Sequence, residues 1–187
     1  MTPEEITPIL KNLFGETVKE SSSDVWEVET EKFRLLVLLS EDNNWLRMLI
    51  PIAPITDVRQ FLEQILEANF DNTQEIRYAL HQNVLWGVFQ HNFLTIVPED
   101  FTAAIKRLVD LKEEGIDSFF QALIESRIVQ IIQAAKMQGQ TQEATLKNLE
   151  RFYAEGLMGE IDMEPEIREK TLAAWRFQLE RLWPEVN

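Results

Sequence analysis

Residues 25–52, "VWEVETEKFRLLVLLSEDNNWLRMLIPI", contain three β-strand patterns in succession and are the basis for predicting the fold. Residues 25–31 alternate between acidic and less polar side chains, which is typical of a strand with one buried face. Residues 33–40 are apolar on both faces after Arg34 and predict a central strand. Residues 45–52 return after a turn, and Pro51, which cannot donate to a ladder, indicates a sheet edge or the end of the strand. The stretch predicts an antiparallel three-strand meander.

Helices are expected before and after this meander in the sequence. Thr2 is a suitable N-cap for a first helix with Pro3 at its first position, and Gly15 is a suitable stop. After the meander, Asp57 is expected to cap a second helix, since Gln60 follows at the spacing of a capping box. A third helix is predicted to open at Pro98.

The segment "HQNVLWGVFQHN", 81–92, contains both histidines of the chain. Residues 74–80 and 84–90 are strand-like, so "HQN" is expected to be a three-residue hairpin connection. His81 then lies in the turn and His91 lies at the far end of the second strand. Ten extended residues span about 33 Å, which is too far for both imidazoles to bind one metal ion. The histidines are therefore interpreted as structural residues.

The rest of the chain is predicted to be helical. A break is expected at 114–117, followed by a strongly apolar helix, and the polar segment "MQGQTQ", 137–142, is the best internal boundary. Two more helices follow, the last one opened by Pro165. The sequence thus predicts an α+β domain over 1–136, with an antiparallel sheet in the order α-β-β-β-α-β-β-α, and a C-terminal helical extension over 140–187 that packs on or next to it.

Composition excludes several classes of function. The chain has 187 residues, 45% of them hydrophobic, which is enough for a packed core. It has no cysteine, so disulfides, thiol nucleophiles and Cys-ligated metals are excluded. The net charge of −14, with dispersed basic residues, disfavours nucleic acids and anionic membranes as partners. No signal peptide or long apolar run is recognisable, so a cytoplasmic soluble protein is expected.

Catalytic or cofactor motifs are not found in the sequence. It contains no phosphate-binding loop, zinc-protease helix, nucleophile elbow or EF-hand string. Four alternating carboxylates could hold a hard cation, and they are Glu160, Asp162, Glu164 and Glu166. Pro165 opens a helix there, however, and a first helical turn favours acidic residues in any case. No catalytic residue, metal or cofactor is therefore predicted.

The order of elements resembles that of the class I type III secretion chaperones and of the YbjN-type proteins that share their fold. The resemblance covers roughly residues 1–135. It rests on the element order, the amphipathic helix "VRQFLEQILEANF" at 58–70, the short "HQN" hairpin and the acidic composition. It implies a small acidic homodimer without a catalytic centre, which grips an extended partner segment across apolar surface. The extension 140–187 departs from the family pattern and leaves open whether it covers that surface.

Apolar residues in two regions are the candidates for partner binding. One region is the broad stripe of the helix over 119–135, and the other surrounds Gly87, a strand glycine that indicates a bulge or the close approach of a partner backbone. The predicted residues are Trp86, Gly87, Phe89, Phe119, Phe120, Ile124 and Ile128. Core packing is the alternative role for the five tryptophans.

The sequence is compatible with three functions. The first is a protein-binding module of chaperone or adaptor type. The second is a structural or regulatory homodimer without a client, in which the subunit interface or the C-terminal extension consumes the apolar stripe. The third is an enzyme that uses carboxylates or a hard metal, which would require acidic side chains from several elements to meet in one pocket.

Overall fold

The computed structural model describes residues 1–155 and 165–186, except for the side chains of Tyr153, Lys170 and Thr171 and of residues 165–168. The chain forms two compact units, Met1–Phe119 and Phe120–Asn187. The first unit contains the sheet and its helices, and the second contains helices. Each unit is described by itself below.

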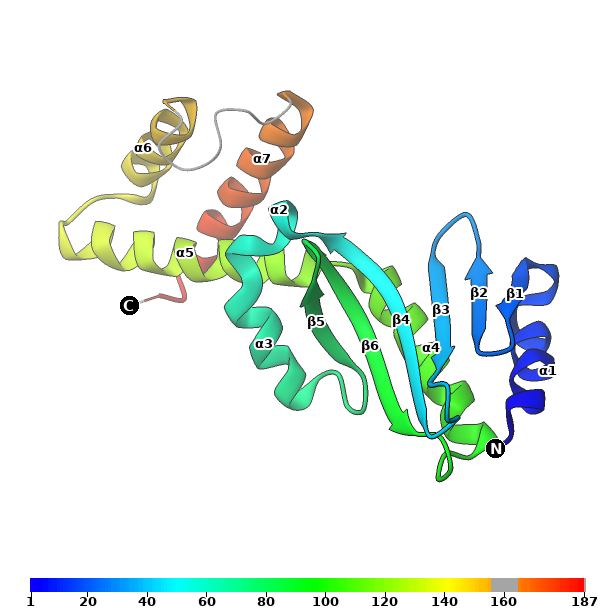
Figure 1. Cartoon of the computed structure of the whole chain (residues 1–187). Coiled ribbons are helices and arrows are strands. Elements are labelled where there is room, and N and C mark those ends of the chain that lie inside the picture. Colours follow the sequence, from blue (N-terminus) through cyan, green and yellow to red (C-terminus); the bar gives the residue numbers. More distant parts are fainter. Residues whose placement is uncertain (156–164, 187) are drawn as a thin grey trace. The chain divides into compact units, whose positions relative to one another are not determined.

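The first unit is built on a six-stranded antiparallel sheet with the strand order β1-β2-β3-β4-β6-β5 (Figure 1). The strands are β1 (Val18–Ser22), β2 (Val25–Glu29), β3 (Arg34–Leu39), β4 (Trp45–Pro54), β5 (Arg77–His81) and β6 (Val84–Asn92). The predicted meander corresponds to β2, β3 and β4, and the predicted hairpin corresponds to β5 and β6. The α+β class and the antiparallel sheet are therefore confirmed.

Strand β1 was not expected from the sequence. It pairs with β2, and four of its five residues are exposed, so the strand carries little apolar signal. The element order therefore contains four strands before the second helical segment, where the sequence predicted three.

The prediction for Pro51 was wrong, because this residue lies neither in an edge strand nor at the end of β4. It runs for ten residues between β3 and β6. Its ladder with β6 shifts in register between Pro51 and Ala53. This irregularity lets a residue without an N–H group lie in a central strand.

The hairpin turn is also shorter than predicted. His81 is the last residue of β5 and pairs with Val84, so the loop consists of Gln82 and Asn83. Both loop residues have positive φ angles, 49° and 62°, as the two central residues of a type I′ turn require.

The helical elements of the first unit are α1 (Pro3–Phe14), η1 (Gly15–Thr17), α2 (Ile55–Val58), η2 (Arg59–Phe61), α3 (Leu62–Asp71) and α4 (Pro98–Glu114). Thr2 caps α1, and its backbone N–H donates a 2.6 Å hydrogen bond to the carboxylate of Glu5. Asp57, by contrast, is not a cap, since α2 begins at Ile55 after Pro54. The single helix expected at 58–70 is divided by the 3₁₀ turn η2.

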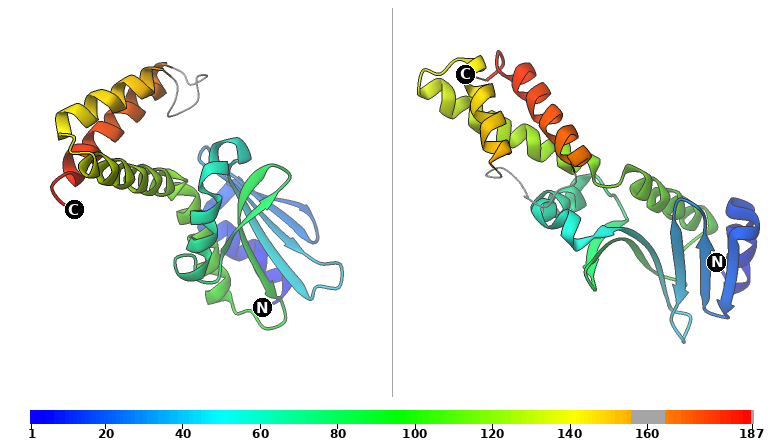
Figure 2. Two further views of the ribbon diagram at one scale, coloured as in Figure 1. Left: turned by 90° about the vertical axis from the view of Figure 1, so that its left-hand side faces the viewer. Right: turned by 90° about the horizontal axis from the view of Figure 1, so that it is seen from above.

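Helices α1 and α4 lie on one side of the sheet (Figure 2). The strand residues that face them are buried, in strict alternation along β2, β3, β4 and β6. On β6 these residues are Leu85, Gly87 and Phe89. A Cβ atom on Gly87 would lie 2.9 Å from side-chain carbons of Ile50 and Leu111, so the glycine lets α4 approach the sheet closely.

Helix α3 meets the sheet at its outermost strand. The Asn69 side-chain amide donates to the carbonyl of Tyr78 at 3.1 Å, and its oxygen accepts from the N–H of Tyr78 at 2.8 Å. Tyr78 lies in β5 and its side chain is buried. One asparagine therefore satisfies both backbone groups of this residue.

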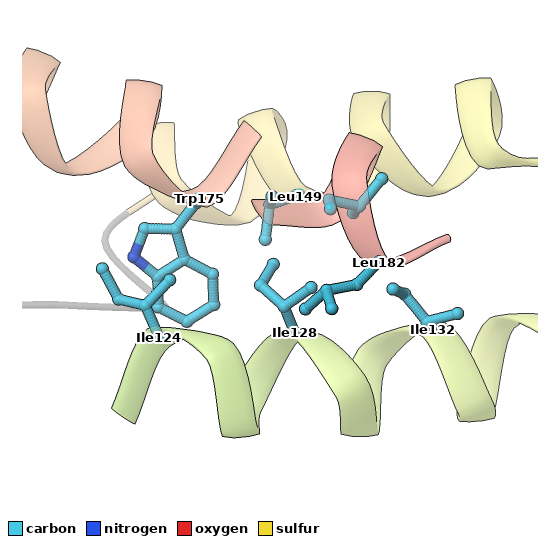
Figure 3. Close-up of a cluster of buried hydrophobic side chains, with 7 residues drawn as sticks. Ile124, Ile128, Ile132, Leu149, Trp175 and Leu182 are labelled. Atoms are coloured by element: carbon cyan, nitrogen blue, oxygen red, sulfur yellow. The ribbon is translucent and has the colours of Figure 1, made fainter. Parts of the chain in front are cut away.

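The second unit is a helical assembly made from most of α5 (Asp117–Met137), α6 (Gln142–Ala154) and α7 (Pro165–Leu182). Its core contains buried residues from all three helices (Figure 3). They are Ile124, Ile128, Ile132, Leu149, Trp175, Leu179 and Leu182. The units divide at Phe119, whereas the sequence placed the domain boundary at 137–142, because the apolar face of α5 packs on the two helices that follow it.

Candidate functional site

The sheet of the first unit has a second face, which points away from α1 and α4 and is called the open face here. Its side chains alternate with the buried ones, and the register places them in rows across β4, β6 and β5. One row pairs Arg47 with Gln90, and the next contains Leu49, Val88 and Arg77. A third row contains Pro51, Trp86 and Ala79.

A hollow of about 530 Å³ lies on the open face. It is lined by Arg47, Leu49, Glu75, Arg77, Ala79, His81, Trp86, Val88 and Gln90. The four apolar members of this set are half-buried, and the polar members are exposed. The hollow thus combines apolar contact area with exposed polar groups, which is the usual arrangement of a binding site.

Trp86 is the largest apolar side chain in the hollow. Its indole N–H donates a 3.2 Å hydrogen bond to the backbone carbonyl of His81. Its neighbours across the ladders are Pro51 and Ala79, which are both small. The hydrogen bond satisfies the polar atom of the indole and leaves its ring as an apolar surface.

The charged residues of the hollow are not balanced. Glu75 forms an ion pair with Arg107 of α4. The guanidinium of Arg77 donates to the backbone carbonyls of Gln74 and Ile76, and Arg47 donates to the side-chain oxygen of Gln90. No ion pair found among the described residues includes Arg47 or Arg77.

Another arginine on the same sheet is paired. Arg34 donates to the carboxylate of Glu27 at 2.6 Å, and this hydrogen bond lowers the pKa of Glu27. Both residues lie outside the lining of the hollow. The hollow is therefore a locally positive area in a chain of net charge −14.

Only one of the seven residues predicted to bind a partner lines the hollow, and it is Trp86. Gly87 and Phe89 belong to the buried face beneath α4. Gly87 is not itself the site of a bulge, since the register shift lies at Pro51 and Ala53 of β4.

The other four predicted residues pack against their own units, where Ile124 and Ile128 are buried and Phe119 and Phe120 are half-buried. The ring of Phe119 lies edge-on to that of Tyr78, with 5.6 Å between centroids. Phe120 packs against the core of the second unit, and Ile124 and Ile128 belong to that core. The protein's own helices therefore cover this part of the apolar stripe.

The histidines lie apart, as expected from the sequence. Val84, which pairs with His81, and His91 are seven residues apart on β6, or about 23 Å along an extended strand. The ring of His91 stacks on Phe89.

In the part of the chain that the structure describes, no three His, Cys, Asp or Glu side chains form a potential metal site. The acidic stretch 160–166 lies outside the residues whose side chains are described. None of the described helices is long and apolar enough to span a membrane.

Sequence reasoning missed Arg47, Leu49 and Val88. Their alternation with Leu46 and Met48, or with Leu85 and Phe89, was a usable signal for the second face of each strand. The pairing of β4 with β6 was not available from local patterns, however, because the two strands are separated by α2 and α3.

No protein family model and no functionally described protein sequence matches the chain. The chain is similar to the solved structure of the Yersinia pestis type III secretion chaperone SycH in complex with a fragment of YscM2, at 18% identity and a TM-score of 0.48, over 60% of this chain and 98% of that one. The ExsC–ExsE complex matches at 16% identity and a TM-score of 0.46, over 59% and 90% of the two chains.

The ExoU–SpcU complex of the Pseudomonas aeruginosa type III secretion system matches at 13% identity and a TM-score of 0.47, over 58% of this chain and 93% of that one. These likenesses agree with the resemblance to secretion chaperones that the order of elements indicated.

Proposed function

We propose that this chain is a non-enzymatic protein-binding module of chaperone or adaptor type. In this proposal it works in the cytoplasm as a small acidic homodimer and holds a partner polypeptide on the open face of its sheet. The observation that carries the proposal is the hollow around Trp86, where half-buried apolar side chains lie on a sheet face that α1 and α4 do not cover.

The binding surface is assigned to the sheet and not to the helix. The stripe over 119–135 was one of two candidate regions in the sequence, but Ile124 and Ile128 of that stripe are buried by α6 and α7. Of the residues predicted to bind a partner, Trp86 lines the hollow, together with Leu49 and Val88, which were not predicted. Aromatic residues in a partly buried setting contribute strongly to binding, so Trp86 is the residue on which the proposal depends most.

A homodimer requires a second surface that is free when the partner is bound. Helix α3 offers one, because Leu66 and Phe70 have exposed fractions of 67% and 89%. Exposed apolar side chains that lie together favour a contact with another chain. We assign the subunit contact to this helix.

A homodimer without any client is the second candidate function. It is favoured by the burial of the apolar stripe under α6 and α7, because the second unit then has less apolar surface to offer to a partner. The two candidates differ in whether the open face is needed for association with another protein.

The test is affinity capture of the tagged chain from its native lysate, followed by reconstitution with the purified partner and measurement of mass by light scattering. A stoichiometric partner that binds the native chain and the exposed-surface control Phe177→Ala, but not Trp86→Ala, would support the proposal. A partner that binds Trp86→Ala equally well would refute the assignment to the open face. A homodimer of twice 21.9 kDa that captures no partner would favour the second candidate.

A further inference from the structure

We propose that the hollow selects an extended polypeptide segment with the pattern acidic-x-apolar-x-acidic, where x is any residue. The inference rests on the proposed function, because it specifies the chemistry of the partner that the open face would hold. It is carried by the charges of the hollow and by the spacing of its two arginines.

The charges favour carboxylates over other polar groups. Arg47 and Arg77 bond to an amide oxygen and to backbone carbonyls, which leaves their positive charges without a counter-ion among the described residues. The nearby carboxylate of Glu75 is already paired with Arg107. A guanidinium forms its strongest hydrogen bonds with carboxylates, often two at a time.

The spacing of the two arginines fits an extended chain. Arg47 lies opposite Gln90 and Arg77 lies opposite Val88, on the two strands that flank β6. Two strand spacings of about 4.8 Å and a two-residue offset of about 6.7 Å place their Cα atoms about 12 Å apart. Residues i and i+4 of an extended segment are about 13 Å apart and point to the same side.

An apolar side chain lies at the middle of the line that joins the two arginines. The midpoint between the Cα atoms of Arg47 and Arg77 falls on β6 between Val88 and Gln90, and Leu49 pairs with Val88. Residue i+2 of the bound segment would point to the same side as residues i and i+4 and would lie over Val88 and Gln90, next to Leu49. An apolar residue is therefore expected at that position, since it would remove half-buried apolar surface from water.

The net charge of −14 opposes an acidic partner at long range. At about 0.15 M salt the Debye length is about 8 Å, so distant charges are screened while a guanidinium in contact with a carboxylate is not. At physiological ionic strength, the contact between an arginine of the hollow and a carboxylate of the partner therefore decides the preference for acidic residues. Lower salt is expected to slow association by strengthening the long-range repulsion.

The experiment uses three synthetic peptides and the ¹⁵N-labelled full chain. One peptide contains Glu-Ser-Leu-Ser-Glu, the second contains Gln-Ser-Leu-Ser-Gln, and the third contains Glu-Glu-Ser-Leu-Ser, which keeps the composition and removes the spacing. Binding is read from the indole N–H resonance of Trp86, which is assigned among the five tryptophans by its loss in Trp86→Phe. The mass of each variant is measured by light scattering.

The first peptide is expected to bind about tenfold more tightly than the other two, or about threefold for each arginine engaged. The double variant Arg47→Gln/Arg77→Gln is expected to bind all three peptides equally. The matched control Arg34→Gln, on the same sheet but paired with Glu27, is expected to keep the preference.

Equal binding of the first two peptides to the native chain would overturn the acidic preference and leave the proposed function standing. Equal binding of the first and third would overturn the pattern. If no peptide shifts the Trp86 resonance, the inference fails. The proposed function then also fails only if the captured partner binds Trp86→Ala as well as it binds the native chain. A dimer that becomes a monomer in the double variant would show that a second copy occupies the hollow, and this would also overturn the inference.

Discussion

Replacing Gly87 with alanine should destabilise the first unit, although alanine is normally the better residue in a strand. The added Cβ would lie 2.9 Å from Ile50 Cγ2 and from Leu111 Cδ2, and 3.2 Å from Leu108 Cδ2. Carbon atoms pack best at about 3.5–4.0 Å, so two contacts are short by at least about 0.6 Å. The obstacle is side-chain packing, because the φ angle of Gly87 lies outside the positive region that side chains avoid.

The expected loss is about 0.5–2 kcal/mol in the free energy of unfolding. Extra methyl groups in a well-packed core cost about 1–3 kcal/mol. The lower backbone entropy of alanine in the unfolded chain offsets about 0.5–1 kcal/mol of that cost. Gly87→Val should cost more, because its two methyl groups would extend farther toward α4.

Urea unfolding, followed by tryptophan fluorescence, measures the effect. With a slope of about 2 kcal/mol per molar urea, the midpoint of Gly87→Ala should fall by about 0.25–1 M. Leu111→Ala removes one of the two crowded atoms. The double variant Gly87→Ala/Leu111→Ala should therefore lose about 1 kcal/mol less free energy of unfolding than the two single variants lose in sum. An unchanged or raised midpoint in Gly87→Ala, or strict additivity in the double variant, would refute the packing argument.

Two further predictions concern the strand β5. Asn69→Ala removes the partner of both backbone groups of Tyr78 and should cost about 1–3 kcal/mol, with faster amide hydrogen exchange at Tyr78, whereas unchanged exchange there would contradict the role of Asn69. Burial, with a smaller contribution from Glu114, raises the pKa of Tyr78 to about 12, so the unfolded chain should lose this proton near pH 10 while the folded chain keeps it. Stability from this group is complete below pH 10 and should fall as the pH rises toward 12. Titration of tyrosinate absorbance should show one of the two tyrosines ionising late, and this late step should be absent in Tyr78→Phe.

Local patterns predicted the elements that have a buried apolar face. Alternation identified β2, and the apolar runs identified β3 and β4, because each strand buries every second residue. Strand β1 was not predicted, because Lys19, Glu20 and Ser21 face solvent and give no apolar pattern. Its formation depends on pairing with β2. The prediction that Pro51 marks a sheet edge or a strand end failed for a related reason. The register shift that accommodates this proline lies in the ladder with β6 and cannot be predicted from the sequence of one strand.

The candidate site was predictable only in part. Trp86 was chosen from the sequence as an aromatic residue beside a strand glycine, and it lines the hollow. Phe89 was chosen with it although an odd separation of three residues places the two side chains on opposite faces. Arg47 and Arg77 come from strands that never pair with each other, so their common site depends on the insertion of β6 between β4 and β5.

The two hydrogen bonds between Asn69 and Tyr78 have a consequence for the behaviour of the protein at high concentration. β5 is the last strand of the sheet, and its outer backbone groups would otherwise offer a template for strand pairing between molecules. The amide of Asn69 occupies one such donor–acceptor pair within the molecule. At the opposite margin, β1 carries charged side chains and a register shift between Glu20 and Ser22, which are features that discourage edge-to-edge aggregation. The sheet therefore ends at both margins in ways that keep the chain from growing into a fibre.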